Sequence, residues 1–188
     1  MASLKYPVAD FDDTLYDPAR QIDTHTVELL ADCTWINDGR NLIITGSTGT
    51  GKSWLSNALC VSARRQFKTV RYIRANILMN ELEQANITDR YLEYINQMSR
   101  YDLLVIDDFG LMQLDLDKCR NLFEVIDRRD CRKSTMIVSQ FPVTAWYDLF
   151  ADNTYADACL DRMIYKVYRL QMDDIPSNSG KNHPHQIL

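Results

Sequence analysis

The stretch Asn41-Leu-Ile-Ile-Thr-Gly-Ser-Thr-Gly-Thr-Gly-Lys-Ser-Trp54 decides the fold, because an apolar run leads straight into the spacing Gly46-x-x-x-x-Gly51-Lys52-Ser53. Glycines let the backbone adopt positive φ and bring successive N–H groups around phosphate oxygens, while the helix that follows directs its positive end at them. This order of strand, glycine-rich loop and helix predicts a P-loop. The expected nucleotide-binding residues are Gly46, Ser47, Thr48, Gly49, Thr50, Gly51, Lys52, Ser53 and Trp54.

Two side chains of this loop are expected to contact the phosphates and the metal ion. Lys52 is expected to reach the β and γ phosphates of ATP, and the Ser53 hydroxyl is expected to ligate Mg²⁺. A glycine-rich turn before an ordinary helix is the alternative. The strand before the loop and the helical spacing of Leu55, Ala58 and Leu59 after it favour the P-loop.

A second apolar run ends in two carboxylates, Leu103-Leu-Val-Ile-Asp107-Asp108. Such a continuous run is typical of a strand buried on both faces of a parallel sheet. Two acids at its end are costly to hold without a cation, so we expect a Walker B element in which Asp107 holds Mg²⁺ and Asp108 orients the attacking water. An Asp-rich turn that caps the next helix is the alternative reading.

A third apolar run, over 133–140, ends in Ser139 and Gln140. Ligands of open α/β sheets bind at the carboxyl ends of the strands. We therefore expect these two side chains to sense the γ-phosphate or hold the attacking water. A plain transition from strand to loop explains them nearly as well.

Strands and helices alternate from Asn41 onward, which predicts a parallel α/β sheet with crossover helices. Periodicity predicts helices over 19–35, 75–85, 90–99, 116–129, 143–150 and 155–165, and strands over 68–73, 101–108, 133–140 and 166–171. The expected organisation is an extended lead-in at 1–18, one ATPase core at 19–172 and a mobile tail at 173–188.

Composition narrows the class of protein. The net charge of −5 argues against a chain coated with nucleic-acid-binding charge, but it does not exclude a local basic face. The cluster Arg128, Arg129, Arg132 and Lys133 serves either an interaction or merely a solvated helix end. Five scattered cysteines suggest neither a metal site nor a disulfide framework, and no run reaches the ~20 apolar residues of a membrane span. A reduced cytoplasm fits best.

With these motifs assembled, the chain resembles the IstB/DnaC group of AAA+ ATPases, and within it the insertion-sequence helpers of the IstB type. The resemblance runs from about residue 11 to residue 170 and rests most on 46–55, 103–111, 139–142 and 156–162. It implies a P-loop NTPase fold of the AAA+ type, with a five-stranded parallel sheet in the order 5-1-4-3-2 flanked by helices. It places Ser139 and Gln140 at the sensor 1 position.

The same resemblance implies that Arg162 is an arginine finger that reaches the ATP of a neighbouring subunit in a homo-oligomer. Pairing of Arg162 with a carboxylate of its own chain is the alternative. Members of the group carry a helical domain before the ATPase core, whereas this chain begins almost at the core. They also commonly end in Gly-x-Ser-x-Arg, where this chain has Ser177-Asn-Ser-Gly-Lys181-Asn, so a sensor 2 role for Lys181 is not favoured.

The expected function is an ATP-hydrolysing protein that assembles on duplex DNA and assists a transposase. A DnaC-like helicase loader that acts on single-stranded DNA is the first alternative. A binding module gated by ATP without turnover is the second, although Lys52, Ser53, Asp107 and Asp108 argue against it. A small-molecule kinase also uses a P-loop, but the Asp107-Asp108 tandem and the Arg162 segment are features of assembly ATPases.

Overall fold

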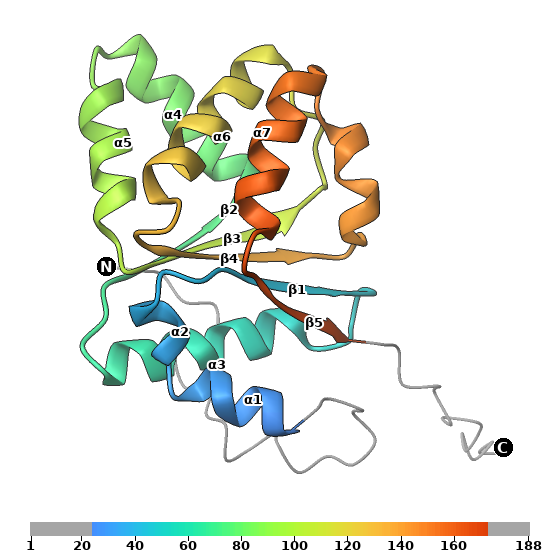
Figure 1. Cartoon of the computed structure of the whole chain (residues 1–188). Coiled ribbons are helices and arrows are strands. Elements are labelled where there is room, and N and C mark those ends of the chain that lie inside the picture. The colour runs from blue at the N-terminus through green and yellow to red at the C-terminus, as the bar shows by residue number, and fades with distance from the viewer. Residues whose placement is uncertain (1–23, 173–188) are drawn as a thin grey trace, which may run out of the picture.

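The computed structural model describes residues 24–172, which form a parallel sheet with helices on both faces (Figure 1). Within these residues the sheet has five strands in the order β2-β3-β4-β1-β5, and every pairing is parallel. The strands are β1 (Leu42–Gly46), β2 (Val70–Arg74), β3 (Leu103–Phe109), β4 (Ser134–Ser139) and β5 (Tyr168–Met172). The predicted strand order is confirmed.

The helices lie in two layers, one on each face of the sheet (Figure 1). The first layer holds α1 (Thr24–Ala31), α2 (Thr34–Asn37) and α3 (Lys52–Arg65). The second layer holds α4 (Ala75–Ile87), α5 (Tyr91–Arg100), α6 (Leu116–Arg129) and α7 (Asn153–Ile164). Because each crossover helix returns the chain to the edge where strands begin, the loops that follow the strands gather at the opposite edge.

The central strands supply both cores, which explains their unbroken apolar sequences. In β3, Leu104 and Ile106 pack into the core under α4 to α7, whereas Leu103 and Val105 pack into the core against α1 to α3. Alternate side chains of a strand point to opposite faces, so a strand covered on both faces needs apolar residues throughout.

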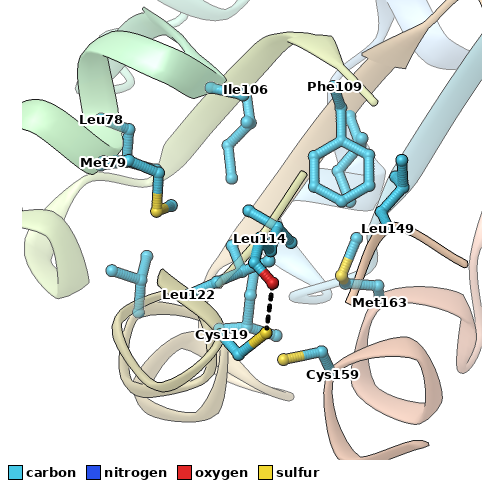
Figure 2. Packing of buried hydrophobic residues seen from close by; sticks show 14 of the residues in the cluster. Leu78, Met79, Ile106, Phe109, Leu114, Cys119, Leu122, Leu149, Cys159 and Met163 are labelled. Carbon is cyan, nitrogen blue, oxygen red and sulfur yellow. Dashed lines mark hydrogen bonds between the residues drawn. The ribbon is translucent and has the colours of Figure 1, made fainter. Parts of the chain in front are cut away.

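The larger core lies between the sheet and α4 to α7 (Figure 2). Leu78 and Met79 reach it from α4, and Phe109 packs edge to face on Trp146 with ring centroids 4.8 Å apart. The Cys119 thiol donates a hydrogen bond to the carbonyl oxygen of Leu114 at 3.2 Å. This core fixes the carboxyl end of β3, where the two consecutive acids lie.

Two predicted helices differ from the structure. The described part of the helix expected over 19–35 is broken at Cys33, whose φ of 55° separates α1 from α2. The break allows the buried Trp35 indole to donate to the Leu30 carbonyl at 3.0 Å. The helix expected over 143–150 is instead a pair of 3₁₀ turns, η2 (Val143–Ala145) and η3 (Tyr147–Leu149).

The second difference has a local cause. The segment after η3 is drawn into an extended pairing with Leu114, which donates to the Leu149 carbonyl and accepts from the Ala151 amide at 2.8 and 2.9 Å. A continuous helix cannot make these bonds. The predictions for 1–18 and for 173–188, Lys181 included, lie outside the described residues.

Candidate nucleotide-binding site

The P-loop connects β1 to α3, as the sequence predicts. Gly46 ends β1 with a φ of 149°, and a Cβ atom there would lie 2.1 Å from the carbonyl oxygen of Met172. Gly51 is the N-cap of α3 with a φ of 94°. Only glycine fits the first position without moving β5, and glycine adopts the second without strain. The loop therefore turns directly from the strand into a helix whose N-terminus faces a cavity.

The Lys52 ammonium group lies over the first turn of this loop. Its Nζ donates to the carbonyl oxygens of Gly46 and Ser47, each at 2.5 Å. Lys52 and Ser53 begin α3, and both line a cavity of about 400 Å³ together with Trp54. Trp54 also packs against the core that α3 shares with the sheet.

Asp107 and Asp108 lie on the other side of the same cavity. Asp107 is buried, with 5% of its surface exposed. Its carboxylate accepts from the Tyr72 hydroxyl at 2.5 Å and from the Asp108 amide at 2.8 Å. Burial, the Asp107 charge and this hydrogen bond raise the pKa of Tyr72, so the tyrosine stays protonated and donates. No site role is predicted for Tyr72 from the sequence, because a residue within a strand does not reveal which carboxylate its hydroxyl reaches.

Asp108 points elsewhere because the backbone changes direction at it. Its φ is 56°, and the register between β3 and β4 shifts between Ile106 and Phe109. Such an irregularity re-aims one side chain relative to the strand. The Asp108 carboxylate forms an ion pair of 3.4 Å with Nε of Arg74, at the end of β2. Asp107 is thus buried in a hydrogen-bonded network, whereas Asp108 is partly exposed at the cavity.

The two residues at the end of β4 have different surroundings. Gln140 lies against the P-loop, where its Oε1 accepts from the Thr48 hydroxyl at 2.8 Å. Ser139 is buried, donates to the Phe109 carbonyl at 2.6 Å and accepts from the Phe141 amide at 3.0 Å. Because its single proton is engaged with Phe109, Ser139 links β4 to β3 here. Ser139 and Gln140 both line the cavity next to the P-loop.

Arg162 lies far from the P-loop of its own chain. Its carbonyl oxygen accepts from Asn41, the residue before β1, whereas the P-loop follows the opposite end of that strand. A strand of five residues spans about 16 Å. The Asp127 carboxylate lies 2.9 Å from both Nε and Nη2 of Arg162 and pairs with its guanidinium group. The guanidinium carbon lies 4.9 Å from the centroid of the Phe123 ring. The alternative that the sequence left open, pairing of Arg162 with a carboxylate of its own chain, therefore has a partner in Asp127.

The basic cluster expected at 128–133 is largely engaged within the chain. Arg129 is 1% exposed and donates to four oxygens, those of Met98, Tyr101, Ser134 and Thr135. Burial lowers the pKa of its guanidinium to about 9. Arg129 cannot contribute to a surface, so its inclusion in an interaction cluster was wrong. Arg128 contacts Asn96 and Glu124, Lys133 contacts Asp102, and Arg132 is exposed.

The donor set of this cavity fits Mg²⁺ bound together with ATP. A hydroxyl from Ser53 and carboxylates from Asp107 and Asp108 are the hard oxygen ligands that Mg²⁺ uses beside phosphates and water. Across residues 24–172, no three His, Cys, Asp or Glu side chains gather into a group that holds a metal by itself. The cation would therefore take its remaining ligands from the nucleotide and water.

The fold and the cavity together define a P-loop protein of the AAA+ class. The family model described as IstB-like ATP binding protein matches residues 1–181, and the chain belongs to this family. It is 37% identical over 171 residues to the putative insertion sequence ATP-binding protein y4uH of Sinorhizobium fredii, covering 91% of this chain and 68% of that relative. Its identity to y4pL of the same organism is 36% over 161 residues, covering 86% and 66%.

The chain thus spans about two thirds of the length of these relatives. Among solved structures it is similar to DnaI, with a TM-score of 0.73 at 17% identity over 88% of this chain and 91% of that one. It is also similar to the DnaC helicase loader, with a TM-score of 0.67 at 18% identity over 79% and 87%. At such identities the likeness concerns the fold alone. Within residues 24–172, no helix is both long and apolar enough to cross a membrane.

Proposed function

We propose that this protein hydrolyses ATP in a Mg²⁺-dependent reaction and works as a homo-oligomer on DNA, assisting a transposase in the cytoplasm. One observation carries the ATPase proposal: Lys52 and Ser53 line a single cavity with Asp107 and Asp108. Phosphoryl transfer depends mainly on positioning and on neutralising charge, and these four side chains supply both. The family supports ATP binding, and hydrolysis is our inference.

Each residue has a role set by its surroundings. Lys52 exchanges its contacts with the loop carbonyls for oxygens of the β and γ phosphates. Ser53 and Asp107 would hold Mg²⁺, which would supply positive charge to neutralise those phosphates. Asp108, outside the buried network of Asp107, orients the water that attacks the γ-phosphorus, and Gln140 lies close enough to the P-loop to report on the γ-phosphate.

Arg162 completes the site of a neighbouring subunit in this proposal. Its position at the far edge of the sheet prevents it from serving its own P-loop, and Asp127 and Phe123 hold its guanidinium in one orientation. A finger in trans contributes about 10³ to 10⁵ in rate in well-studied NTPases. Hydrolysis should therefore depend on assembly.

Mixing two inactive variants tests the trans arrangement. Lys52→Ala lacks a working ATP site and Arg162→Ala lacks the finger, so a mixed interface joins an intact site to an intact finger. We expect activity per subunit to rise with wild-type concentration and to be partly restored in the mixture. Failure of the mixture to recover activity, under conditions where the two variants co-assemble by light scattering, would exclude the mechanism.

The DNA and transposase roles rest on the relatives, whose names assign them to insertion sequences. A helicase loader is the second candidate, supported by the fold shared with DnaC and DnaI. Stimulation of ATP turnover by duplex DNA favours the first function, and stimulation by single strands alone favours the second. Turnover without any small phosphate acceptor would exclude a kinase.

A further inference from the structure

The strands of the sheet begin at the edge opposite the P-loop (Figure 1). Basic residues are frequent in the chain that leads into them. We define this basic edge as the chain before each strand, at 38–41, 64–69, 100–102, 130–133 and 165–167. It holds eight basic residues against three acidic ones, a net charge of +5 in a chain whose total is −5. The basic residues are Arg40, Arg64, Arg65, Lys68, Arg100, Arg132, Lys133 and Lys166.

These segments are continuous across the sheet. Asp102 accepts from Thr69 on one side and from Lys133 on the other, at 2.7 and 2.6 Å. On the far side of Lys133, the backbone of Gly39 lies against that of Cys131. Five strands about 4.8 Å apart make the edge roughly 19 Å long, which corresponds to about five or six base pairs of duplex DNA.

Helix dipoles explain only part of this charge. Four helices longer than one turn, α3, α5, α6 and α7, end at the basic edge, and the C-terminus of such a helix carries about −0.5 of an elementary charge. Together they amount to roughly −2, which leaves an excess of about +3. The edge is therefore an electropositive surface and not merely a row of satisfied helix ends.

The most unusual residue of the edge is Phe67, which is 95% exposed. The amide of Phe67 donates to the Arg64 carbonyl and that of Lys68 to the Ala63 carbonyl, each at 3.0 Å. This is the Schellman pattern that ends many helices, and its left-handed position usually belongs to glycine. Phe67 occupies that position with a φ of 60°. A bulky residue there strains the backbone and leaves an aromatic ring in water, so it is unfavourable for folding on both counts.

We propose that the basic edge binds the phosphate backbone of DNA and that Phe67 contacts the face of a base. An exposed ring just after a helix whose last two residues are Arg64 and Arg65 is a combination suited to nucleic acid, since stacking and phosphate contacts act together. An acidic protein is the other partner that could bind the basic charges, but its binding would not explain the exposed Phe67 ring. The inference rests on the proposed association with DNA and assigns it a surface.

Removal of two charges tests the phosphate contacts. Arg64→Ala with Arg65→Ala in the full chain is compared with Lys118→Ala and Arg120→Ala, which removes two basic residues from the first half of α6. The probes are a labelled oligothymidine and a labelled duplex of about 20 nucleotides per strand, read by fluorescence anisotropy over a salt series. At 0.1 M salt each lost contact should weaken binding about eightfold on duplex and about fivefold on a single strand. The salt slope should fall by about 0.9 on duplex or 0.7 on a single strand. The control pair should change neither quantity.

Replacement of Phe67 by glycine tests the ring. Phe67→Gly gives the Schellman position its usual residue, so the melting temperature should stay or rise. Affinity for the probe whose base the ring contacts should nevertheless fall about five- to 150-fold, as expected for one lost stacking contact. Greater thermal stability with weaker DNA binding cannot come from misfolding.

The outcomes separate this inference from the proposed function. If the wild type binds a probe but both edge variants bind it equally well, the basic edge is not the DNA surface and the proposed function stands. An equal loss of DNA affinity in the Lys118 and Arg120 control also overturns the inference, because binding would then depend on total charge and not on the basic edge. If the wild type binds neither probe, the association with DNA and the inference fail together.

Discussion

Tyr72→Phe should loosen the Walker B carboxylate without altering any residue proposed to touch ATP. The variant removes one oxygen atom, whose proton is donated to Asp107 at 2.5 Å. A hydrogen bond to a charged group contributes about 1.5–3 kcal/mol, and the 5% exposure of Asp107 leaves little water to replace it. For a domain of this size each kcal/mol shifts the melting temperature by about 2–4 °C, so the variant should melt roughly 3–12 °C lower.

The same change should weaken Mg²⁺ binding at saturating ATP by about tenfold or more, because a ligating carboxylate depends on the partners that orient it. Thermal melts without nucleotide and a calorimetric Mg²⁺ titration in the presence of ATP measure the two effects. Tyr94→Phe is the matched control, since the Tyr94 hydroxyl also donates to a carboxylate at 2.5 Å. That acid is Glu81, which is 37% exposed and also bound to Arg71.

The control should melt no more than about 2–4 °C below the wild type, since an exposed pair contributes less than about 1 kcal/mol, and should titrate with Mg²⁺ normally. If Tyr72→Phe matched the control in both measurements, the reasoning that Tyr72 fixes Asp107 would be refuted.

Three further predictions concern the site and the sheet edge. Lys52→Ala should weaken ATP binding by about 10- to 150-fold in a calorimetric titration, the size of a lost charge-assisted contact, and unchanged affinity would remove Lys52 from the site. Asp108→Asn should keep ATP binding but slow turnover by about 10²- to 10⁴-fold in a phosphate-release assay, and turnover at the wild-type rate would show that Asp108 does not orient the water. Asp102→Asn should lower the free energy of unfolding by up to about 2 kcal/mol at pH 7, measured by urea titration. The gap to the wild type should close as the pH falls from about 4 toward 2, and a gap that persists at pH 2 would contradict this explanation.

The sign of the last prediction follows from the surroundings of Asp102. Burial opposes ionisation, but hydrogen bonds from Lys133 and Thr69 outweigh it and lower the pKa of Asp102 from 3.8 to about 2. An acid whose pKa is depressed by folding stabilises the folded state above its unfolded pKa. That contribution disappears as the carboxylate protonates in the folded protein.

The sequence predicted the elements whose signals are local. The P-loop spacing places Gly46 to Ser53 by itself, and the apolar run before Asp107 identifies a buried strand whatever surrounds it. The strand order came from the resemblance to a known group, because no local pattern records which strands become neighbours.

The features that sequence reasoning missed depend on contacts between distant segments. Tyr72 reaches Asp107 across 35 positions of the chain, and Arg129 is buried because Met98 and Ser134 present carbonyl oxygens to it. The sequence of the basic cluster at 128–133 shows no sign that one of its four basic residues faces inward. The bond from the Ser139 hydroxyl to the Phe109 carbonyl is also a contact between distant segments, which the end of a strand does not reveal.

Gly46 ties the nucleotide loop to the last strand of the sheet. On one side of this residue the Lys52 ammonium holds its carbonyl, and on the other the Met172 carbonyl lies where a side chain would otherwise be. When Lys52 transfers its bonds to phosphate, the first turn of the loop can move only as far as β5 allows. The edge strand β5 therefore limits how far the first turn of the loop can move toward it.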